Sequence, residues 1–305
     1  MKAYYTDQFV LPLPDGHRFP MAKYAILRTR VAVAQLATLE VPAPVTDADL
    51  HRVHMPDYVR RVSAGTLDPA AQRAIGFPWS PGMVERSRRS VGATLAACRA
   101  ALADGVAVNL AGGTHHAFPD HGEGFCVFND AAVAVRTLQA EQVVSRVLIV
   151  DCDVHQGNGT AAIFAGDDQV FTLDLFAEKN YPFRKEAPDL AVPLPDGTGD
   201  APYLDLLGAA LPHAIAAARP HLAVYVSGAD PHAGDRLGRL DLSKEGLEHR
   251  DRLVLDALHQ QGVPVAVTMA GGYGRDLADT VDIHLGTVQA AARISAAARA
   301  RPESA

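Results

Sequence analysis

Cysteine is scarce in this sequence of 305 residues, which contains only Cys98, Cys126 and Cys152. No pair of them has the CxxC spacing of a thiol metal site, and three cysteines do not make a disulfide framework. The sequence also lacks an unbroken run of the ~18 apolar residues that a membrane span needs. Its N-terminal stretch lacks the basic-then-apolar layout of a signal peptide. We therefore expect a cytoplasmic protein that does not act at a membrane.

An excess of positive charge is lacking too, because 28 Lys and Arg stand against 35 Asp and Glu, a net charge of -7. Direct nucleic acid binding needs clustered cations against the phosphates and is therefore disfavoured. Apolar residues make up 48% of the chain, which is enough for a sizeable core. No repeat, linker or low-complexity block interrupts it before about residue 295. We expect a single domain over residues 1–305, with the last eight residues, ARARPESA, as a flexible tail.

Short apolar runs separated by helical or loop sequence predict buried strands at Val106–Leu110, Val147–Val150, Val170–Leu175, Ala223–Val226 and Val265–Met269. Helices are expected over Pro81–Asp104, capped by Ser80, and over Lys244–Gln261, capped by Ser243. Pro212 should kink or break the helical run Tyr203–Ala218. Strands that alternate with helices predict a mostly parallel sheet between two helical layers, a three-layer α/β/α fold.

Polar residues follow the C-terminal ends of four of these runs. VAVNL leads into AGGTHHAF, VLIV into DCDVHQGNG, AVYV into SGADPHAGD, and VAVTM into AGGYG. Open α/β sheets bind ligands at the carboxyl ends of their strands, so these segments should meet at one edge. The residues that would gather there are His115, His116, Asp151, Asp153, His155, Asp230 and Tyr273.

Asp153 and His155 are two apart on an extended segment, so both side chains can point to the same side. Asp230 from another strand end supplies a third ligand, which leaves room for water and a substrate oxygen, as in catalytic metal sites. Zinc is the default ion, and iron(II), manganese or cobalt also suit such ligands. A lone DxH pair is more often a cap or a turn, and adjacent histidines or a GGYG turn are individually unspecific. The combination at one sheet edge therefore carries the prediction.

Five segments, AGGTHHAF, GEGFCVFNDAAVA, VDCDVHQGNGT, SGADPHAGDRLG and AGGYG, resemble the successive blocks of histone deacetylases, in the same order. The resemblance extends from HRFPMAKY at residues 17–24 to VDIHLGTV near the C-terminus, and its detail is most similar to the class IV branch and to bacterial deacetylase-like proteins. It implies an arginase/deacetylase fold with an eight-stranded parallel sheet. It also implies hydrolysis of an N-acyl amide such as acetyl-lysine.

The resemblance also implies roles for individual residues. Asp153, His155 and Asp230 would bind one divalent metal ion, and Tyr273 would polarise the substrate carbonyl. The remaining positions are a catalytic pair, His115 and His116, with their partners Asp151 and Asn158, and an acyl tunnel formed by Gly124, Phe125, Phe183 and Leu237. Because Asp151 is charged and Asn158 is neutral, we expect His115 to stay protonated and His116 to act as general base, with a pKa near ~6.5.

One departure concerns the structural potassium ion that the family often holds. Asp174 and Phe176 stand where the family usually has a hydroxyl residue and a histidine, which counts against the ion. Backbone carbonyls around Asp151, Asp153 and His155 could still bind one.

The substrate class stays open at this point. It could be an acylated lysine in a protein or peptide, or a small acylated amine such as an acetylpolyamine, with acetyl or longer chains. A ureohydrolase would need a second carboxylate cluster, and SGADPHAGD lacks the dense SxDxDxxDP pattern. An inactive binding module would be expected to lose a ligand or the tyrosine, and none is lost. The sequence does not indicate an oligomeric state.

Overall fold

The computed structural model describes residues 1–300. Eight strands form one sheet in the order β2-β1-β3-β8-β7-β4-β5-β6, and every neighbouring pair is parallel. They are β1 (Lys2–Tyr4), β2 (Thr38–Glu40), β3 (Val106–Asn109), β4 (Val147–Asp151), β5 (Val170–Ala177), β6 (Leu190–Leu194), β7 (Leu222–Ser227) and β8 (Val265–Met269). The expected eight-stranded α/β fold is confirmed. The assignment of the whole chain to a single domain stays a prediction.

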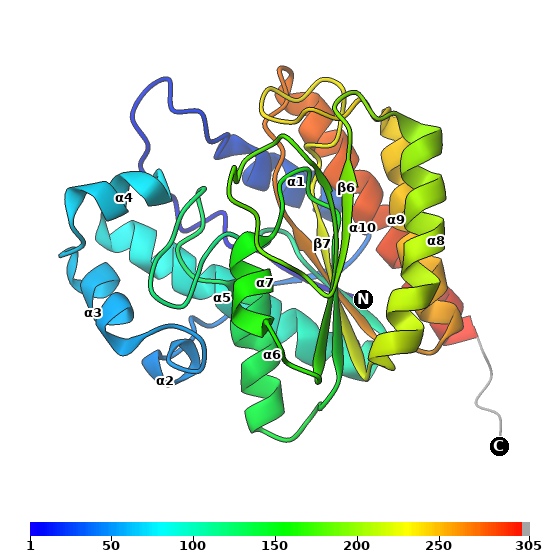
Figure 1. Cartoon of the computed structure of the whole chain (residues 1–305), viewed down its shortest axis with the longest axis horizontal. Helices are drawn as coiled ribbons and strands as arrows, with labels where there is room; N and C mark the ends of the chain where they lie inside the picture. Colours follow the sequence, from blue (N-terminus) through cyan, green and yellow to red (C-terminus); the bar gives the residue numbers. More distant parts are fainter. Residues whose placement is uncertain (301–305) are drawn as a thin grey trace.

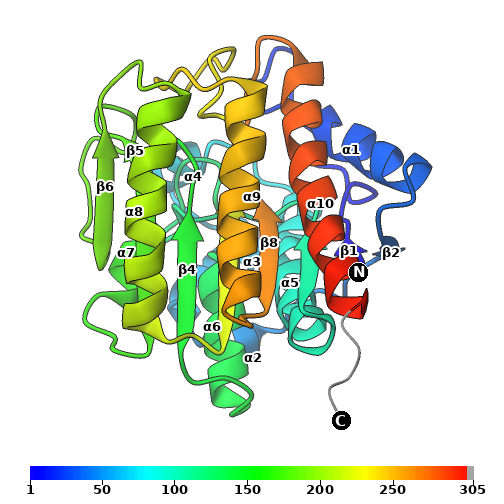
Figure 2. The same ribbon diagram turned by 90° about the vertical axis from the view of Figure 1, so that its right-hand side faces the viewer.

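Helices cover both faces of the sheet, which Figure 1 shows edge-on. One face carries α8 (Asp200–Ala218), α9 (Lys244–Gln260) and α10 (Leu277–Ala300), as Figure 2 shows, with α1 (Ala22–Val33) beside α10. The other face carries α5 (Pro81–Asp104), α6 (Asp130–Ala140) and α7 (Asn158–Phe164), with α2 (Asp47–Leu50), α3 (Pro56–Ala64) and α4 (Pro69–Ile75) outside them. None of the described helices has the length and apolarity that a bilayer span requires.

The sheet separates two apolar layers, and the alternation of side chains along β4 shows why. Leu148 and Val150 pack into the layer under α8, α9 and α10, whereas Val147 and Ile149 pack into the layer under α5 and α6. Successive side chains of a strand point to opposite faces, so a strand covered on both sides is apolar throughout. This burial explains why the continuous apolar runs of the sequence are strands.

The five strands expected from the sequence are β3, β4, β5, β7 and β8. Helix α5 has the expected bounds, and the Ser80 hydroxyl accepts from the Met83 amide at 3.0 Å. Ser243 caps α9 in the same way, and this helix ends one residue earlier than expected, at Gln260. The tail expected from residue 298 lies outside the described residues from 301 on, while α10 continues to Ala300.

The expected break at Pro212 is wrong, because α8 runs unbroken through it, whereas the expected kink stays a prediction. A proline inside a helix removes one backbone hydrogen bond and crowds the carbonyl four residues before it. Here Leu207, Leu211 and Ala214 are fully buried on both sides of Pro212. Their packing against the sheet keeps the chain helical despite the lost hydrogen bond.

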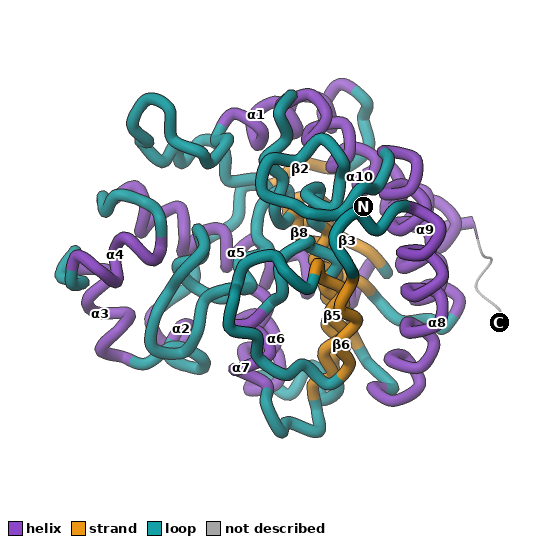
Figure 3. Tube along the Cα trace, turned by 45° about the horizontal axis from the view of Figure 1, so that its top comes forward, coloured by secondary structure: helices purple, strands orange, loops and turns teal. Residues whose placement is uncertain are grey.

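The four strands that precede the polar segments are neighbours in the sheet, in the order β3-β8-β7-β4. Because they are parallel, their carboxyl ends lie side by side. Loops, drawn in teal in Figure 3, gather over this end of the sheet. The sheet therefore brings the four polar segments together.

A fully buried arginine of α9 hydrogen-bonds to two of these segments. Arg250 of α9 is 0% exposed and donates to the carbonyls of Cys152, at 3.1 Å, and of Gly228, at 2.6 Å. Its charge is balanced by Asp251, which also accepts from the Tyr225 hydroxyl at 2.5 Å. Arg250 thus connects the loops after β4 and β7 to one helix.

Arg250→Met should lower the free energy of unfolding by about 3–5 kcal/mol, because it leaves Asp251 as an unpaired buried charge and two carbonyls without donors. Arg252→Met on the same helix removes a half-exposed ion pair with Glu248 and should cost less than about 1 kcal/mol. Urea unfolding of both variants makes the comparison. Equal losses of stability would show that the Arg250 network does not support the fold.

Candidate metal centre and active site

The polar residues expected at the sheet edge lie together in the structure. Asp151 ends β4, and Asp153 and His155 follow it in the next loop. Asp230 comes after β7 and Tyr273 after β8, while His115 and His116 come from the loop after β3. All of these side chains are buried.

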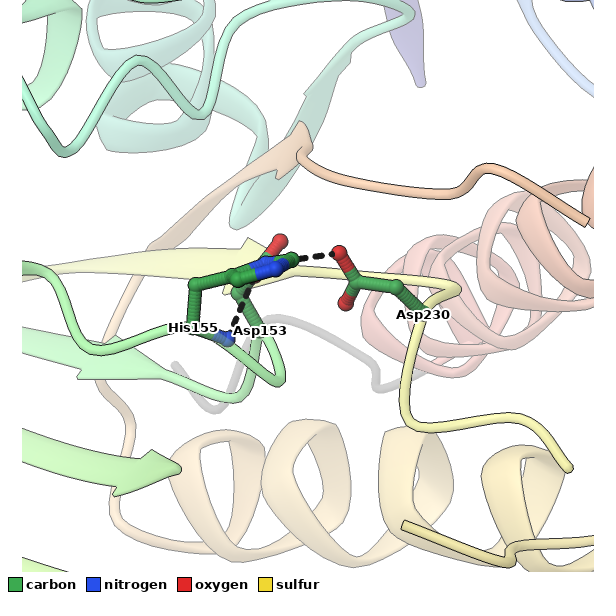
Figure 4. Close-up of side chains that lie close together, drawn as sticks. All are labelled: Asp153, His155 and Asp230. Atoms are coloured by element: carbon green, nitrogen blue, oxygen red, sulfur yellow. Dashed lines mark hydrogen bonds and ion pairs between the residues drawn. The ribbon is translucent and has the colours of Figure 1, made fainter. Parts of the chain in front are cut away.

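Three of them form a cluster with the composition of a metal site. One ligand atom each from Asp153, His155 and Asp230 lies within 4.8 Å of the other two. The Nδ1 atom of His155 lies 2.9 Å from Asp153 Oδ1 and 3.2 Å from Asp230 Oδ2 (Figure 4). Within residues 1–300 no other group of three acidic, histidine or cysteine side chains meets this distance limit.

Backbone amides donate to the carboxylates of Asp153 and Asp230, and one oxygen of Asp230 has no such donor. Gly271 N–H donates to Asp153 Oδ2 at 2.7 Å, and Val154 N–H donates to Asp230 Oδ1 at 2.9 Å. Asp230 Oδ2 is buried and accepts no well-aligned hydrogen bond, and the His155 ring lies beside it with Nδ1 at 3.2 Å. A buried carboxylate oxygen without a donor is costly unless a cation compensates it. The orphaned oxygen, Asp153 and the imidazole nitrogen therefore fit a divalent metal ion such as zinc or iron(II).

The charges of this cluster depend strongly on one another. Burial and the charge of Asp153 raise the pKa of Asp230 to about 7. Burial opposes a charge on His155, but hydrogen bonds and the charges of Asp153 and Asp230 raise the pKa of His155 to about 10. A dication between the two carboxylates would take over the compensation that this proton provides, since metal ligands bind in their deprotonated form.

His115 pairs with Asp151, Nδ1 to Oδ2, at 2.6 Å. Burial favours the neutral ring, yet the charges of Asp151 and Asp153 and this hydrogen bond raise the pKa of His115 to about 9. A pKa above neutral agrees with the expectation that His115 is an imidazolium.

His116 is placed differently, with Nδ1 2.7 Å from Asn158 Oδ1. An amide oxygen only accepts, so Nδ1 must carry the proton and Nε2 is the free acceptor when the ring is neutral. Burial and the charges of His115 and His155 lower the pKa of His116 well below 6.5, further than the sequence suggests. His116 is therefore the neutral member of the pair.

Tyr273 lies across the metal cluster, with its ring centroid 6.4 Å from that of His155. Phe19 and Phe125 pack against its ring. Gly271, two residues before Tyr273, must be a glycine, because a Cβ atom at this position would stand 1.8 Å from Asp230 Oδ2. The GGYG segment is therefore more than a turn with a packed ring, since its backbone donates to Asp153 of the cluster.

Two residues near the site were missed by the sequence analysis. Lys23 is 1% exposed and donates to the carbonyls of Ala270 and Gly272, so it holds the turn that carries Tyr273. Glu123 accepts from Asn158 Nδ2 at 2.7 Å and thereby fixes which end of the amide faces His116. The only sequence signal for both was their place in the family blocks HRFPMAKY and GEGF.

The four residues expected to form the acyl tunnel line one cavity of about 390 Å³. Gly124, Phe125, Phe183 and Leu237 share it with His116, His155 and Tyr273. Phe183 is 87% exposed and therefore lies at the mouth rather than in the interior. The cavity connects the solvent to the buried histidines.

Asp174 occupies the region of the expected potassium site. Its Oδ2 accepts from Gly157 N–H at 2.9 Å, and its Oδ1 is buried without a hydrogen-bond partner. Burial and the charge of Asp151 raise the pKa of Asp174 well above its usual range. Phe176 lies beneath the Lys185 ammonium, 5.4 Å from its ring centroid. That Asp174 and Phe176 count against a potassium ion here stays a prediction.

A family model and the sequences of known proteins both match this chain to the same family. The family model described as "Histone deacetylase domain" matches residues 17–288. The chain is 45% identical to an uncharacterized protein of Picosynechococcus sp., over 92% of this chain and 94% of the relative. It is 35% identical to the histone deacetylase-like amidohydrolase of Pseudomonas aeruginosa, over 86% of this chain and 74% of that protein.

Among solved structures, the HD domain of HDA15 superimposes with a TM-score of 0.79 and 23% sequence identity. The match covers 94% of this chain and 87% of that one. At this identity the likeness speaks for the fold alone, and it agrees with the eight-stranded parallel sheet.

Asp230→Asn should abolish tight binding of the metal, because it removes one of three ligands, a larger change than the ~10- to 100-fold loss of affinity caused by altering an outer partner. Elemental analysis of the purified chain should give one divalent ion for the wild type and a fraction of that for the variant. Asp256→Asn, at an exposed ion pair on α9, is the control and should keep the ion. Two tightly bound transition metals per chain would contradict the mononuclear site.

Proposed function

Because this chain belongs to the histone deacetylase family, we propose that it hydrolyses an N-acyl amide, in the first place an acyl-lysine, with one divalent metal ion. Zinc is the proposed ion, held by Asp153, His155 and Asp230. The family relative from Pseudomonas aeruginosa is named as an amidohydrolase, which supports this class of reaction.

The observation that carries the proposal is the meeting of three groups in one buried space. His116, His155 and Tyr273 line the inner end of one cavity. Asp153 and Asp230 adjoin His155, and His115 lies beside His116. A structural metal site would not need a cavity that reaches it from the solvent. A packing role for Tyr273 would not need its ring beside the metal ligands.

When bound, the metal ion would polarise the amide carbonyl and lower the pKa of a water molecule beside it toward ~7. His116 is neutral with Nε2 free, so it can take the proton from the attacking water and return it to the leaving nitrogen. The C–N bond breaks, the hydroxyl adds to the acyl carbon, and the amine leaves with that proton.

His115 and Tyr273 would stabilise the charge that develops during this step. His115, protonated beside Asp151, contributes a positive charge and a hydrogen-bond donor. The Tyr273 hydroxyl can donate to the carbonyl oxygen as it becomes negative. Gly124, Phe125 and Leu237 line the cavity and would contact the acylated side chain.

The metal-loaded chain should release acetate from a fluorogenic acetyl-lysine amide, and Tyr273→Phe should lose roughly 100- to 1,000-fold in kcat, because one oxyanion donor is removed. The variant should keep its metal and its unfolding midpoint, since the ring still packs. A series of acetyl, butyryl, octanoyl and myristoyl lysine substrates, ranked by kcat/KM, measures the acyl preference. Near-normal kcat in Tyr273→Phe would remove the tyrosine from the mechanism.

Asn158→Asp should move the acidic limb of the kcat/KM profile to higher pH. The new carboxylate would favour the imidazolium form of His116 and raise its pKa from the low value that burial and neighbouring charges impose. Since the base must be neutral, activity would be lost over a pH range where the wild type still works.

Asp151→Asn is the matched change on the other histidine. It should lower kcat by weakening the charge on His115, while the acidic limb, which reports His116, should not move upward. If the limb instead moved downward in Asp151→Asn and stayed unchanged in Asn158→Asp, His115 would be the general base.

A further inference from the structure

The cavity that leads to the site has a cationic mouth. Among its lining residues, Arg18, Arg73, Lys179 and Arg239 have exposed side chains, whereas His116, His155 and Tyr273 are buried at its inner end. Within residues 1–300, no Asp or Glu lines this cavity. Glu178 precedes Lys179 in the chain but does not line it.

Three of the four cations make no close ion pair, although the charge of Arg73 contributes to the lowered pKa of Asp68. Arg239 pairs with Asp196 at 3.0 Å, whereas Arg18, Arg73 and Lys179 make no ion pair in the part of the chain that the structure describes. The whole chain carries a net charge of -7, so its average surface is acidic. An unpaired positive rim on an acidic protein is a local feature and does not follow from the composition.

We propose that the cationic mouth selects an acylated amine with a negative charge close to the acylated chain. This proposal rests on the proposed deacylation and names the substrate class of the same site. The anionic group is a carboxylate, either of acidic residues that flank an acyl-lysine in a peptide or of a small acylated amino acid.

Electrostatic attraction explains why the mouth would favour a carboxylate. A carboxylate beside the mouth meets two or three uncompensated cations, and within a Debye length of ~8–10 Å their attraction adds. An acylated polyamine keeps at least one free ammonium, and a lysine-rich peptide keeps several. Both would be repelled by the same rim, so these two substrate classes are disfavoured.

The test compares substrates that differ only in charge. One arm uses three acetyl-lysine peptides in which the flanking residues are Asp, Asn or Lys. A second arm uses Nα-blocked acetyl-lysine as the free acid and as its carboxamide. An acetylated polyamine completes the set, and kcat/KM is measured by acetate release on the metal-loaded full chain.

Two double variants, each of which removes two positive charges, distinguish an effect of the mouth from an effect of the rest of the surface. Arg73→Gln with Lys179→Gln removes two unpaired cations of the mouth. Arg52→Gln with Arg219→Gln removes two exposed cations that do not line the cavity and is the control. Neither pair includes a residue that contacts the metal ligands or the two histidines.

The wild type should prefer the Asp peptide or the free acid over its neutral partner by roughly fivefold, the combined effect of two exposed charge pairs. This preference should disappear in the mouth variant and at high salt, and it should persist in the control. A preference in the first arm alone identifies acidic peptides, and one in the second arm alone identifies a small acid.

Equal kcat/KM for all charges, or a preference for Lys flanks or the polyamine, would overturn the inference and leave the deacylase function in place. No turnover of any acyl substrate by the metal-loaded chain would overturn the proposed function, and this inference with it.

Discussion

The buried guanidinium of Arg250 is the contact on which the site's geometry depends. It reaches from α9 to the carbonyls of Cys152 and Gly228, which lie one and two residues before the ligands Asp153 and Asp230. These loops leave neighbouring strands, and parallel strands alone do not fix how two loops approach each other. Two hydrogen bonds to one rigid, planar group do fix it. The ligand spacing is thus set by the protein, before any ion is bound.

A second constraint is the balance of buried charge. Asp151, Asp153, Asp174 and Asp230 lie in a small volume, and a buried charge is costly unless it is paired. Asp151 has His115, and backbone amides satisfy most of the other oxygens. Asp174 and Asp230 each keep one oxygen without a hydrogen bond and have raised pKa values, and His155 Nδ1 lies 3.2 Å from that oxygen of Asp230. The clustering of two carboxylates around one imidazole is compatible with a metal ion at this point, in agreement with the proposed function.

The sequence predicted those features that depend on residues close together in the chain. A buried strand followed by polar residues is visible in the chain, so the contents of the site and five strands could be read directly. The order β3-β8-β7-β4 could not be, because it results from helix packing over long sequence distances. The three-residue strands β1 and β2 are too short to show a pattern, and β6 lies at an edge. Lys23 meets Ala270 across 247 residues, so no local pattern marks it as buried.

The buried site is rich in carboxylates, whereas the mouth of the cavity is cationic. The cationic mouth affects how the amine product leaves. An acylated nitrogen is neutral, whereas the amine set free by hydrolysis is protonated in water near neutral pH, since lysine has a pKa of ~10.4. A cationic mouth of Arg18, Arg73 and Lys179 leaves the neutral side chain unaffected but repels the ammonium product. On the proposed substrate class, the same rim that would hold an anionic flank would therefore also weaken rebinding of the deacylated chain. Attraction of the flank and repulsion of the new charge act at different positions of one molecule, so selection and release need not conflict.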